Sequence, residues 1–208
     1  IAEEQESLKS SLTHVQSIKV LNLLEGIELN PDMFDPRWNN DDDGWAPDGE
    51  ERGPPGNTKP YLPPRGWKGY GLKVWDKYGD NEWLNYENVK GEWWVAYHGM
   101  SNPVKATPGI LDKNFIPGPN QCHEGDNDLN HPGEKVKAGV YCSPDPSVAL
   151  SYAENGEGHN NYYVAFMCRV NPDLVQICEG EEDYWVVPGD VNSIRPYRLL
   201  LKEINGND

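Results

Sequence analysis

The C-terminal half of the chain carries short runs of β-branched and aromatic residues, each bounded by Gly, Pro, Asn or Asp, and this pattern limits the fold more than any other feature. Such runs are typical of strands. Six are predicted, at Trp93–Tyr97, Gly139–Cys142, Tyr162–Val170, Leu174–Cys178, Tyr184–Val187 and Ile194–Ile204. Asp145 and Pro146 suit an N-cap and a first helical position, which predicts one short helix over Asp145–Glu154. Many strands with few helices predict an α+β domain rather than a doubly wound sheet.

The composition indicates a core built largely from aromatic side chains. A chain of 208 residues suffices for one well-packed domain, with or without an extension. Apolar residues make up 37% of it, but there are 8 Trp and 11 Tyr, which each bury a large area. The sequence holds neither a G-x-G-x-x-G nor a Walker loop, so dinucleotide binding of the Rossmann type is not expected.

The charge and the cysteines restrict the partners and the compartment. A formal net charge of -16 repels phosphate backbones, which argues against nucleic acid as a partner. Because no apolar run approaches the roughly 20 residues of a membrane helix, no membrane partner is expected. The cysteines form no CxxC pair and predict free thiols in a reducing compartment, hence an intracellular, cytoplasmic domain without structural metal. A start at Ile1 without Met predicts a fragment of a longer chain.

The N-terminal third reads as an extension. Apolar residues three and four apart predict an amphipathic helix over Ser7–Gly26, with a packing helix favoured over the end of a coiled coil. Asn30–Pro64 holds eight of the 18 prolines and an acidic run, which predicts a loop or linker without regular structure. The apolar pattern restarts at Arg65. The predicted division is therefore an extension over residues 1–64 and a folded domain over 65–208.

One acidic segment fits a calcium-loop register. Asn39–Glu50 places oxygen-bearing side chains at positions one, three and five, Gly44 at six and Glu50 at twelve. Pro47 and the proline-rich flanks argue against the paired helices of such a site. A solvated acidic loop is the favoured interpretation, and calcium binding is the alternative.

Three segments carry residues suited to chemistry on a cationic ring. The first is Ala96-Tyr97-His98-Gly99, at the end of a predicted strand. The second runs from Gly139-Val140-Tyr141 through the predicted helix to Tyr152, and the third is Asp183-Tyr184-Trp185-Val186-Val187. A flat cationic ring is held best by aromatic faces, which suits a tyrosine pair. A carboxylate steadies positive charge that develops on a sugar.

Taken together and in this order, the three segments resemble the catalytic signature of poly(ADP-ribose) polymerase-like, diphtheria-toxin-like ADP-ribosyltransferases. The resemblance covers roughly Trp93 to Ile204. It implies a split β-sandwich with few short helices that binds NAD as its substrate.

The resemblance also assigns roles to the site residues. It implies that His98 holds a ribose hydroxyl of NAD, that the Gly99 backbone bonds the nicotinamide carboxamide, and that Tyr141 and Tyr152 sandwich the ring. Ala149 stands where the family usually has a serine that contacts nicotinamide.

The catalytic glutamate of the family has no clear counterpart. Asp183, one methylene shorter, is the residue assigned to that position, and Glu182 and Tyr184 are its one-residue alternatives. The catalytic set implied by the resemblance is thus His98, Tyr152 and Asp183.

The function expected from the resemblance is NAD-dependent ADP-ribosyl transfer, mono- rather than poly-ADP-ribosylation, to a macromolecular acceptor that is expected to be a protein. The alternatives are a catalytically silent module that binds NAD, ADP-ribose or a protein, and an NAD glycohydrolase. The loop over Pro117–Lys137 is where acceptor choice is expected.

Overall fold

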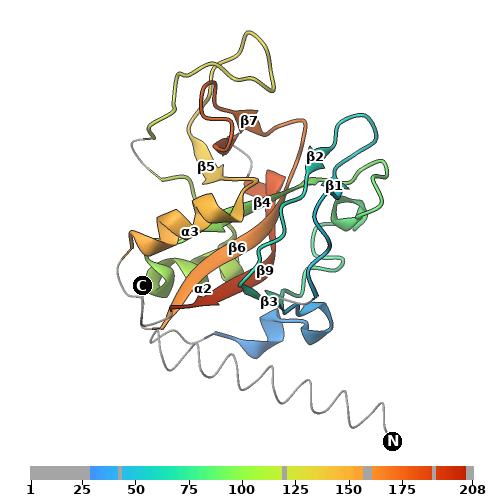
Figure 1. Cartoon of the computed structure of the whole chain (residues 1–208), viewed down its shortest axis with the longest axis vertical. Coiled ribbons are helices and arrows are strands. Elements are labelled where there is room, and N and C mark those ends of the chain that lie inside the picture. Colours follow the sequence, from blue (N-terminus) through green and yellow to red (C-terminus); the bar gives the residue numbers. More distant parts are fainter. Residues whose placement is uncertain (1–28, 42–43, 119–120, 157–160, 189–190, 205–208) are drawn as a thin grey trace, which may run out of the picture.

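A computed structural model describes residues 29–41, 44–118, 121–156, 161–188 and 191–204. The predicted helix over Ser7–Gly26 lies outside the described residues. The described chain is a mixed α+β domain in which every strand pairing is antiparallel, and this confirms the predicted class (Figure 1).

Two sheets form the body of the domain. The larger has the order β3-β9-β6-β4, and the smaller has the order β5-β8-β7. The strand bounds are β3 (Lys68–Gly71), β4 (Trp94–Gly99), β5 (Gly139–Cys142), β6 (Tyr162–Val170), β7 (Gln176–Ile177), β8 (Trp185–Pro188) and β9 (Ile194–Glu203). An isolated β-bridge joins the two sheets between β4 and the residue that follows β5. In it, Tyr97 and Ser143 exchange backbone hydrogen bonds of 2.7 and 2.9 Å.

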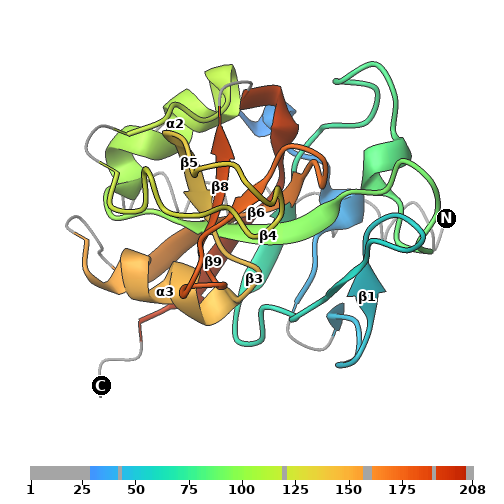
Figure 2. The same cartoon turned by 90° about the horizontal axis from the view of Figure 1, so that it is seen from above.

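Two α-helices flank β4, one on each side (Figure 2). They are α2 (Pro103–Lys113) and α3 (Pro146–Glu154). The 3-10 turns are η1 (Pro31–Met33), η2 (Pro36–Trp38), η4 (Glu82–Leu84) and η5 (Val191–Ser193). The predicted cap of α3 is confirmed, because the Asp145 side chain accepts a hydrogen bond of 2.7 Å from the Ser147 amide.

The sequence predictions place most elements correctly and miss one helix. Strands β5 and β6 have the predicted bounds, whereas the predicted Leu174–Cys178 strand is reduced to Gln176–Ile177. Helix α2 was not predicted, although Asn102 caps it by accepting from the Lys105 amide at 3.1 Å. Pro108 and Gly109 lie inside this helix and weaken its signal, because proline removes a backbone donor and glycine costs conformational entropy.

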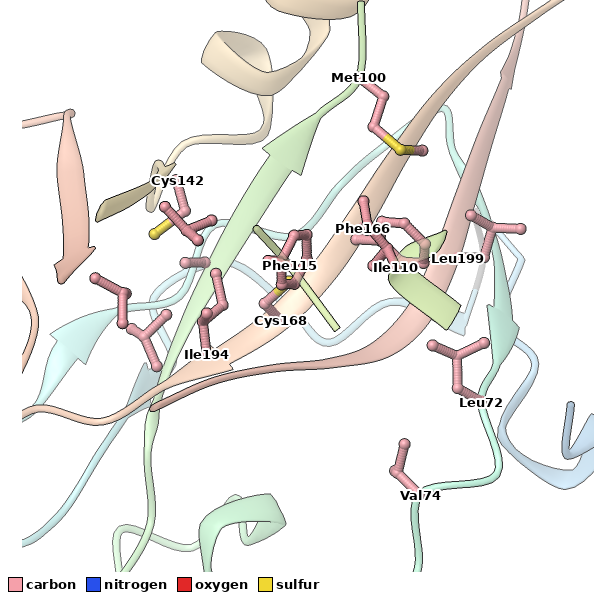
Figure 3. Packing of buried hydrophobic residues seen from close by; sticks show 14 of the residues in the cluster. Leu72, Val74, Met100, Ile110, Phe115, Cys142, Phe166, Cys168, Ile194 and Leu199 are labelled. Atoms are coloured by element: carbon pink, nitrogen blue, oxygen red, sulfur yellow. The ribbon is translucent and has the colours of Figure 1, made fainter. Parts of the chain in front are cut away.

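The larger sheet is buried on both faces. Alternation places Ala96, Phe166 and Leu199 on one face, where α2 and Phe115 cover them. Phe115 packs edge-on against Phe166 with 5.8 Å between ring centroids (Figure 3). Val95, Tyr97, Met167 and Leu200 occupy the opposite face, together with Ala149 of α3.

The predicted linker over Asn30–Pro64 supplies much of the cover of that second face. Trp45 and Tyr61 are buried there, and the Trp45 indole nitrogen donates to the Trp67 carbonyl at 3.1 Å. The segment also contains η1, η2 and the short strand pair β1 (Glu51–Arg52) with β2 (Lys59–Pro60). The expectation of no regular structure was therefore wrong for this segment, because turns between prolines still direct aromatic side chains onto the sheet. The division of the chain at residue 64 stays a prediction.

We expect Trp45→Ala to lower the free energy of unfolding by about 3–5 kcal/mol, since it empties a buried site of a large ring. Urea unfolding followed by circular dichroism measures this. Trp75→Ala is the matched control because Trp75 is 58% exposed, and it should stay within about 0.5 kcal/mol of wild type. Equal and small effects for the two variants would show that the segment does not belong to the core.

Candidate functional site

A small pocket lies where the end of β4 meets α3 and β5. Its volume is about 60 Å³. Because one water needs roughly 10–15 Å³ on this scale, the pocket has room for a few waters, and it is smaller than the roughly 150 Å³ of a cavity that encloses a benzene ring. The residues that line it are Tyr97, His98, Gly99, Tyr141, Cys142, Ser143, Val148, Ala149, Tyr152 and Tyr184. The structure thus brings together His98, Gly99, Tyr141, Ala149 and Tyr152, which the sequence analysis selected from two separate segments.

Close backbone packing positions the helix that carries Tyr152. A Cβ atom built at Gly99 would lie 1.9 Å from the Ala149 carbonyl oxygen. Real Cβ atoms do not approach an oxygen this closely, so a side chain at position 99 would displace α3. Gly99 therefore has a packing role on β4 in addition to the backbone role expected for it.

His98 is fixed by a single strong contact. Its Nδ1 lies 2.7 Å from the Tyr141 carbonyl oxygen, and its ring packs edge-on against Phe115 at 4.8 Å between centroids. Burial lowers the pKa of His98, although the bond to the Tyr141 carbonyl opposes this. In the neutral ring Nδ1 must carry the proton, because a carbonyl oxygen accepts and does not donate. Nε2 is then an acceptor for a hydroxyl group of a ligand.

The tyrosines of the pocket are neutral hydrogen-bonding groups with aromatic faces. Burial raises the pKa of Tyr141 to about 12 and that of Tyr152 to about 12. The rings of Tyr152 and Tyr184 lie edge to face with 6.3 Å between centroids. Tyr152 is 43% exposed, so it forms the rim of the pocket rather than its floor.

His123 is a residue of the site that the sequence analysis did not select. Its ring lies 5.1 Å from that of Tyr184 and 6.0 Å from that of Tyr141, and its backbone amide donates to the Tyr141 hydroxyl at 3.0 Å. Its Nδ1 lies 3.1 Å from Asp126. His123 belongs to the loop over Pro117–Lys137, which therefore packs on the tyrosines of the pocket. No local pattern marks it, because its position depends on how this loop folds back.

The acidic residue expected at the site is not part of the pocket. Asp183 and Glu182 are exposed and line no part of it, whereas Tyr184 does. Tyr184, and not Asp183, therefore lines the pocket, while the assignment of the catalytic position stays a prediction. The physical reason is a turn before β8, in which the Tyr184 amide donates to the Glu181 carbonyl at 2.8 Å. This turn leaves the two carboxylates in solvent and directs the Tyr184 ring toward His123 and Tyr152. No described residue that lines the pocket carries a carboxylate.

Metal binding finds no support in the described residues. They hold no group of three or more His, Cys, Asp or Glu side chains arranged to bind a metal ion. In the segment with the calcium-loop register, Glu50 pairs with Arg52 and Asp48 lies 2.9 Å from Arg65. Residues 42 and 43 of that segment lie outside the described part of the chain.

The thiols agree with the sequence expectation. Cys142, Cys168 and Cys178 are buried and Cys122 is exposed, and all four are free cysteines. Across the described part of the chain, no helix has the length and apolar character needed to cross a membrane.

Comparison with known proteins adds no assignment, since no protein-family model matches the chain and no curated protein matches it.

We expect the buried His98 to make folding stability pH-dependent. Because its pKa lies below 6.5 in the folded chain, the unfolded chain takes up a proton first as the pH falls below about 6.5, and stability decreases there. The contribution is fully present above that pH. Its slope is at most about 1.4 kcal/mol per pH unit.

The measurement is the free energy of unfolding from pH 7.5 to 5.0, in wild type and in His98→Gln. The decrease on acidification should be smaller in the variant, since other titrating groups act equally in both chains. Parallel curves would mean that His98 is not held in its neutral form.

Proposed function

We propose that the pocket binds the nicotinamide end of NAD, in a domain of the poly(ADP-ribose) polymerase-like ADP-ribosyltransferase type. The observation that carries this proposal is the convergence of His98, Gly99, Tyr141 and Tyr152 on one pocket from two separate segments of the chain. Each of these residues was selected by its order and spacing in the sequence. Their meeting in space is an independent support, because unrelated core residues would be spread over the sheet.

The chemistry of the pocket suits this ligand. Tyrosine faces attract a flat cationic ring, and the small volume admits the edge of such a ring rather than a whole dinucleotide. His98 offers Nε2 as an acceptor for a ribose hydroxyl next to the ring. The rest of NAD would extend outside the pocket. Free NAD carries negative phosphates, and a pocket wall without carboxylates in the described residues avoids repelling them.

The same geometry argues for weak or absent catalysis. In ADP-ribosyl transfer the bond between nicotinamide and the ribose anomeric carbon breaks, its electron pair leaves with the nicotinamide, and positive charge develops on the ribose. A carboxylate offsets that charge, whereas the neutral phenol of Tyr184 supplies a hydrogen bond without charge. The function supported best is therefore an NAD-binding module with little or no turnover. Slow mono-ADP-ribosyl transfer is the second candidate, favoured by the presence of His98 and Tyr152.

We expect His98→Ala, Tyr141→Ala and Tyr152→Ala each to weaken NAD binding at least about tenfold, since each removes a hydrogen bond or a stacking face worth about 1–3 kcal/mol. Isothermal titration with NAD and with nicotinamide measures this. Leu174→Ala is the control, because Leu174 is an exposed apolar residue that lines neither this pocket nor the larger cavity around Trp45. Equal binding by wild type and all three variants would remove the nicotinamide assignment.

A second prediction separates binding from turnover. Wild type should release nicotinamide from NAD very slowly or not at all, and Tyr184→Glu should raise that rate at least about tenfold by placing a carboxylate at the pocket. Mass spectrometry of protein and free nicotinamide after incubation with NAD measures both products. Asp183→Asn and Glu182→Gln should leave the wild-type rate unchanged. A measurable wild-type rate that falls about a hundredfold in Asp183→Asn would restore the carboxylate mechanism at Asp183.

A further inference from the structure

A second and larger cavity lies on the face of the four-stranded sheet that Trp45 and Tyr61 cover, which is also the face on which α3 packs. Its volume is about 460 Å³, within the range of roughly 300–1,000 Å³ typical of sites for small ligands. Val95, Met167, Arg169 and Arg198 supply its sheet side, and residues 38–61 cover it. It shares no lining residue with the nicotinamide pocket. Figures 1 and 2 both place β1 and α3 on opposite sides of the molecule.

The charge of this cavity is opposite to that of the protein. Three arginines, Arg52, Arg169 and Arg198, line it, and no Asp or Glu is among its described lining residues. The chain as a whole carries a net charge of -16. In a protein with so many carboxylates, arginine side chains are expected to lie next to Asp or Glu. A cavity lined by arginines without a lining carboxylate is therefore a feature to explain.

Two of the three arginines have carboxylate partners. Arg52 pairs with Glu50, and Arg169 lies 3.6 Å from the buried Glu92. For Arg198, no carboxylate of the described residues lies within 4.0 Å. Its Nε donates to the Trp38 carbonyl at 3.0 Å, and its Nη1 lies 3.8 Å from the Met167 sulfur. Arg198 is thus the cation of the cavity whose charge the described carboxylates leave uncompensated.

Arg169 in the same wall is held by the protein itself, and Glu92 lies beside its charge. Arg169 is 3% exposed, and its Nε is a buried side-chain nitrogen without a hydrogen-bond partner among the described residues. Its other nitrogens donate to the carbonyls of Trp93 and Asn85. Buried N–H groups are rarely left unpaired, because each costs about 1–3 kcal/mol. Because this nitrogen has almost no accessible surface, an acceptor bound in the cavity does not reach it, and the anionic group is assigned to Arg198 alone.

Aromatic rings form the remaining walls. The Arg198 guanidinium lies 5.5 Å from the centre of the Trp45 ring and 5.3 Å from that of Tyr197. Trp38, Trp75 and Tyr86 also line the cavity while 48%, 58% and 67% exposed, so they lie at its rim. Large exposed aromatic side chains around a cavity provide faces on which a flat ligand stacks.

We propose that this cavity is a binding site for a small aromatic anion, a flat ring system that carries a carboxylate or a phosphate. The ring stacks between the rim aromatics and Trp45, and the anionic group pairs with Arg198. A flat cation is disfavoured by the three arginines, and a neutral apolar ligand would leave the charge of Arg198 uncompensated. The site is independent of NAD binding at the nicotinamide pocket.

The experiment uses two probes with the same ring system. 8-Anilinonaphthalene-1-sulfonate is an aromatic anion, and N-phenyl-1-naphthylamine has the same rings without the sulfonate. Fluorescence titration of the folded chain should give one site at which the anion binds at least about tenfold tighter than the neutral probe. Cooperative thermal unfolding of each protein confirms that the probes meet a folded chain. Equal affinities for both probes, or no saturable binding, would overturn the proposal.

Two variants assign the site. Arg198→Gln keeps a donor near the Trp38 carbonyl and should weaken binding of the anionic probe at least about tenfold while leaving the neutral probe unchanged. Tyr86→Ala changes an exposed residue that folding does not depend on and should weaken both probes. His98→Ala should affect neither. Unchanged binding in Arg198→Gln and Tyr86→Ala, or loss of binding in His98→Ala, would overturn the assignment to this cavity.

Competition identifies the anionic group. 1-Naphthoate carries a carboxylate and adenosine 5′-monophosphate carries a phosphate, and each is titrated against the bound anionic probe. Displacement by one of them in wild type but not in Arg198→Gln supports the proposal and names the group. Failure of both to displace the probe would overturn it. Because the readout does not involve NAD, its failure leaves the proposed nicotinamide site unaffected.

Discussion

The backbone bridge between Tyr97 and Ser143 is the contact on which the candidate site depends. It joins the four-stranded sheet to the three-stranded one, and both residues are buried, at 1% and 2% exposure. Tyr97 directly precedes His98 near the end of β4, so the bridge fixes that histidine beside β5. The 2.7 Å contact from His98 to the Tyr141 carbonyl follows from this arrangement. Two hydrogen bonds between sheets thus define where a pocket forms.

Local signals sufficed for the parts of the fold that local chemistry decides. The nearly continuous apolar run over Tyr162–Val170 and the Asp145-Pro146 cap each specify their element within a few residues, and the structure has both. Pocket residues that end a strand or follow that cap were also found from sequence, since their place on an element fixes their place in space. His98, Tyr141 and Tyr152 are of this kind.

The remaining features depend on contacts distant in sequence. Helix α2 forms in spite of Pro108 because Ile110 and Leu111 are buried against the sheet, and no local pattern measures that gain. A single turn decides that Tyr184, and not Asp183, lines the pocket. A one-residue change of register would exchange the side chain that faces inward. Likewise, the cover supplied by Trp45 and Tyr61 comes from a proline-rich segment whose composition suggested a linker.

The glycine at the end of β4 has one more consequence. The Ala149 carbonyl approaches Gly99 so closely that no side-chain atom fits between the main chains of α3 and β4 at this point. The distance between α3 and β4 beside the pocket therefore depends on the absence of a Cβ atom at position 99. A ligand gains no space there by moving side chains aside, because the walls at that point are main chain. A redesign of this end of the pocket would therefore have to begin with the spacing of α3 and β4.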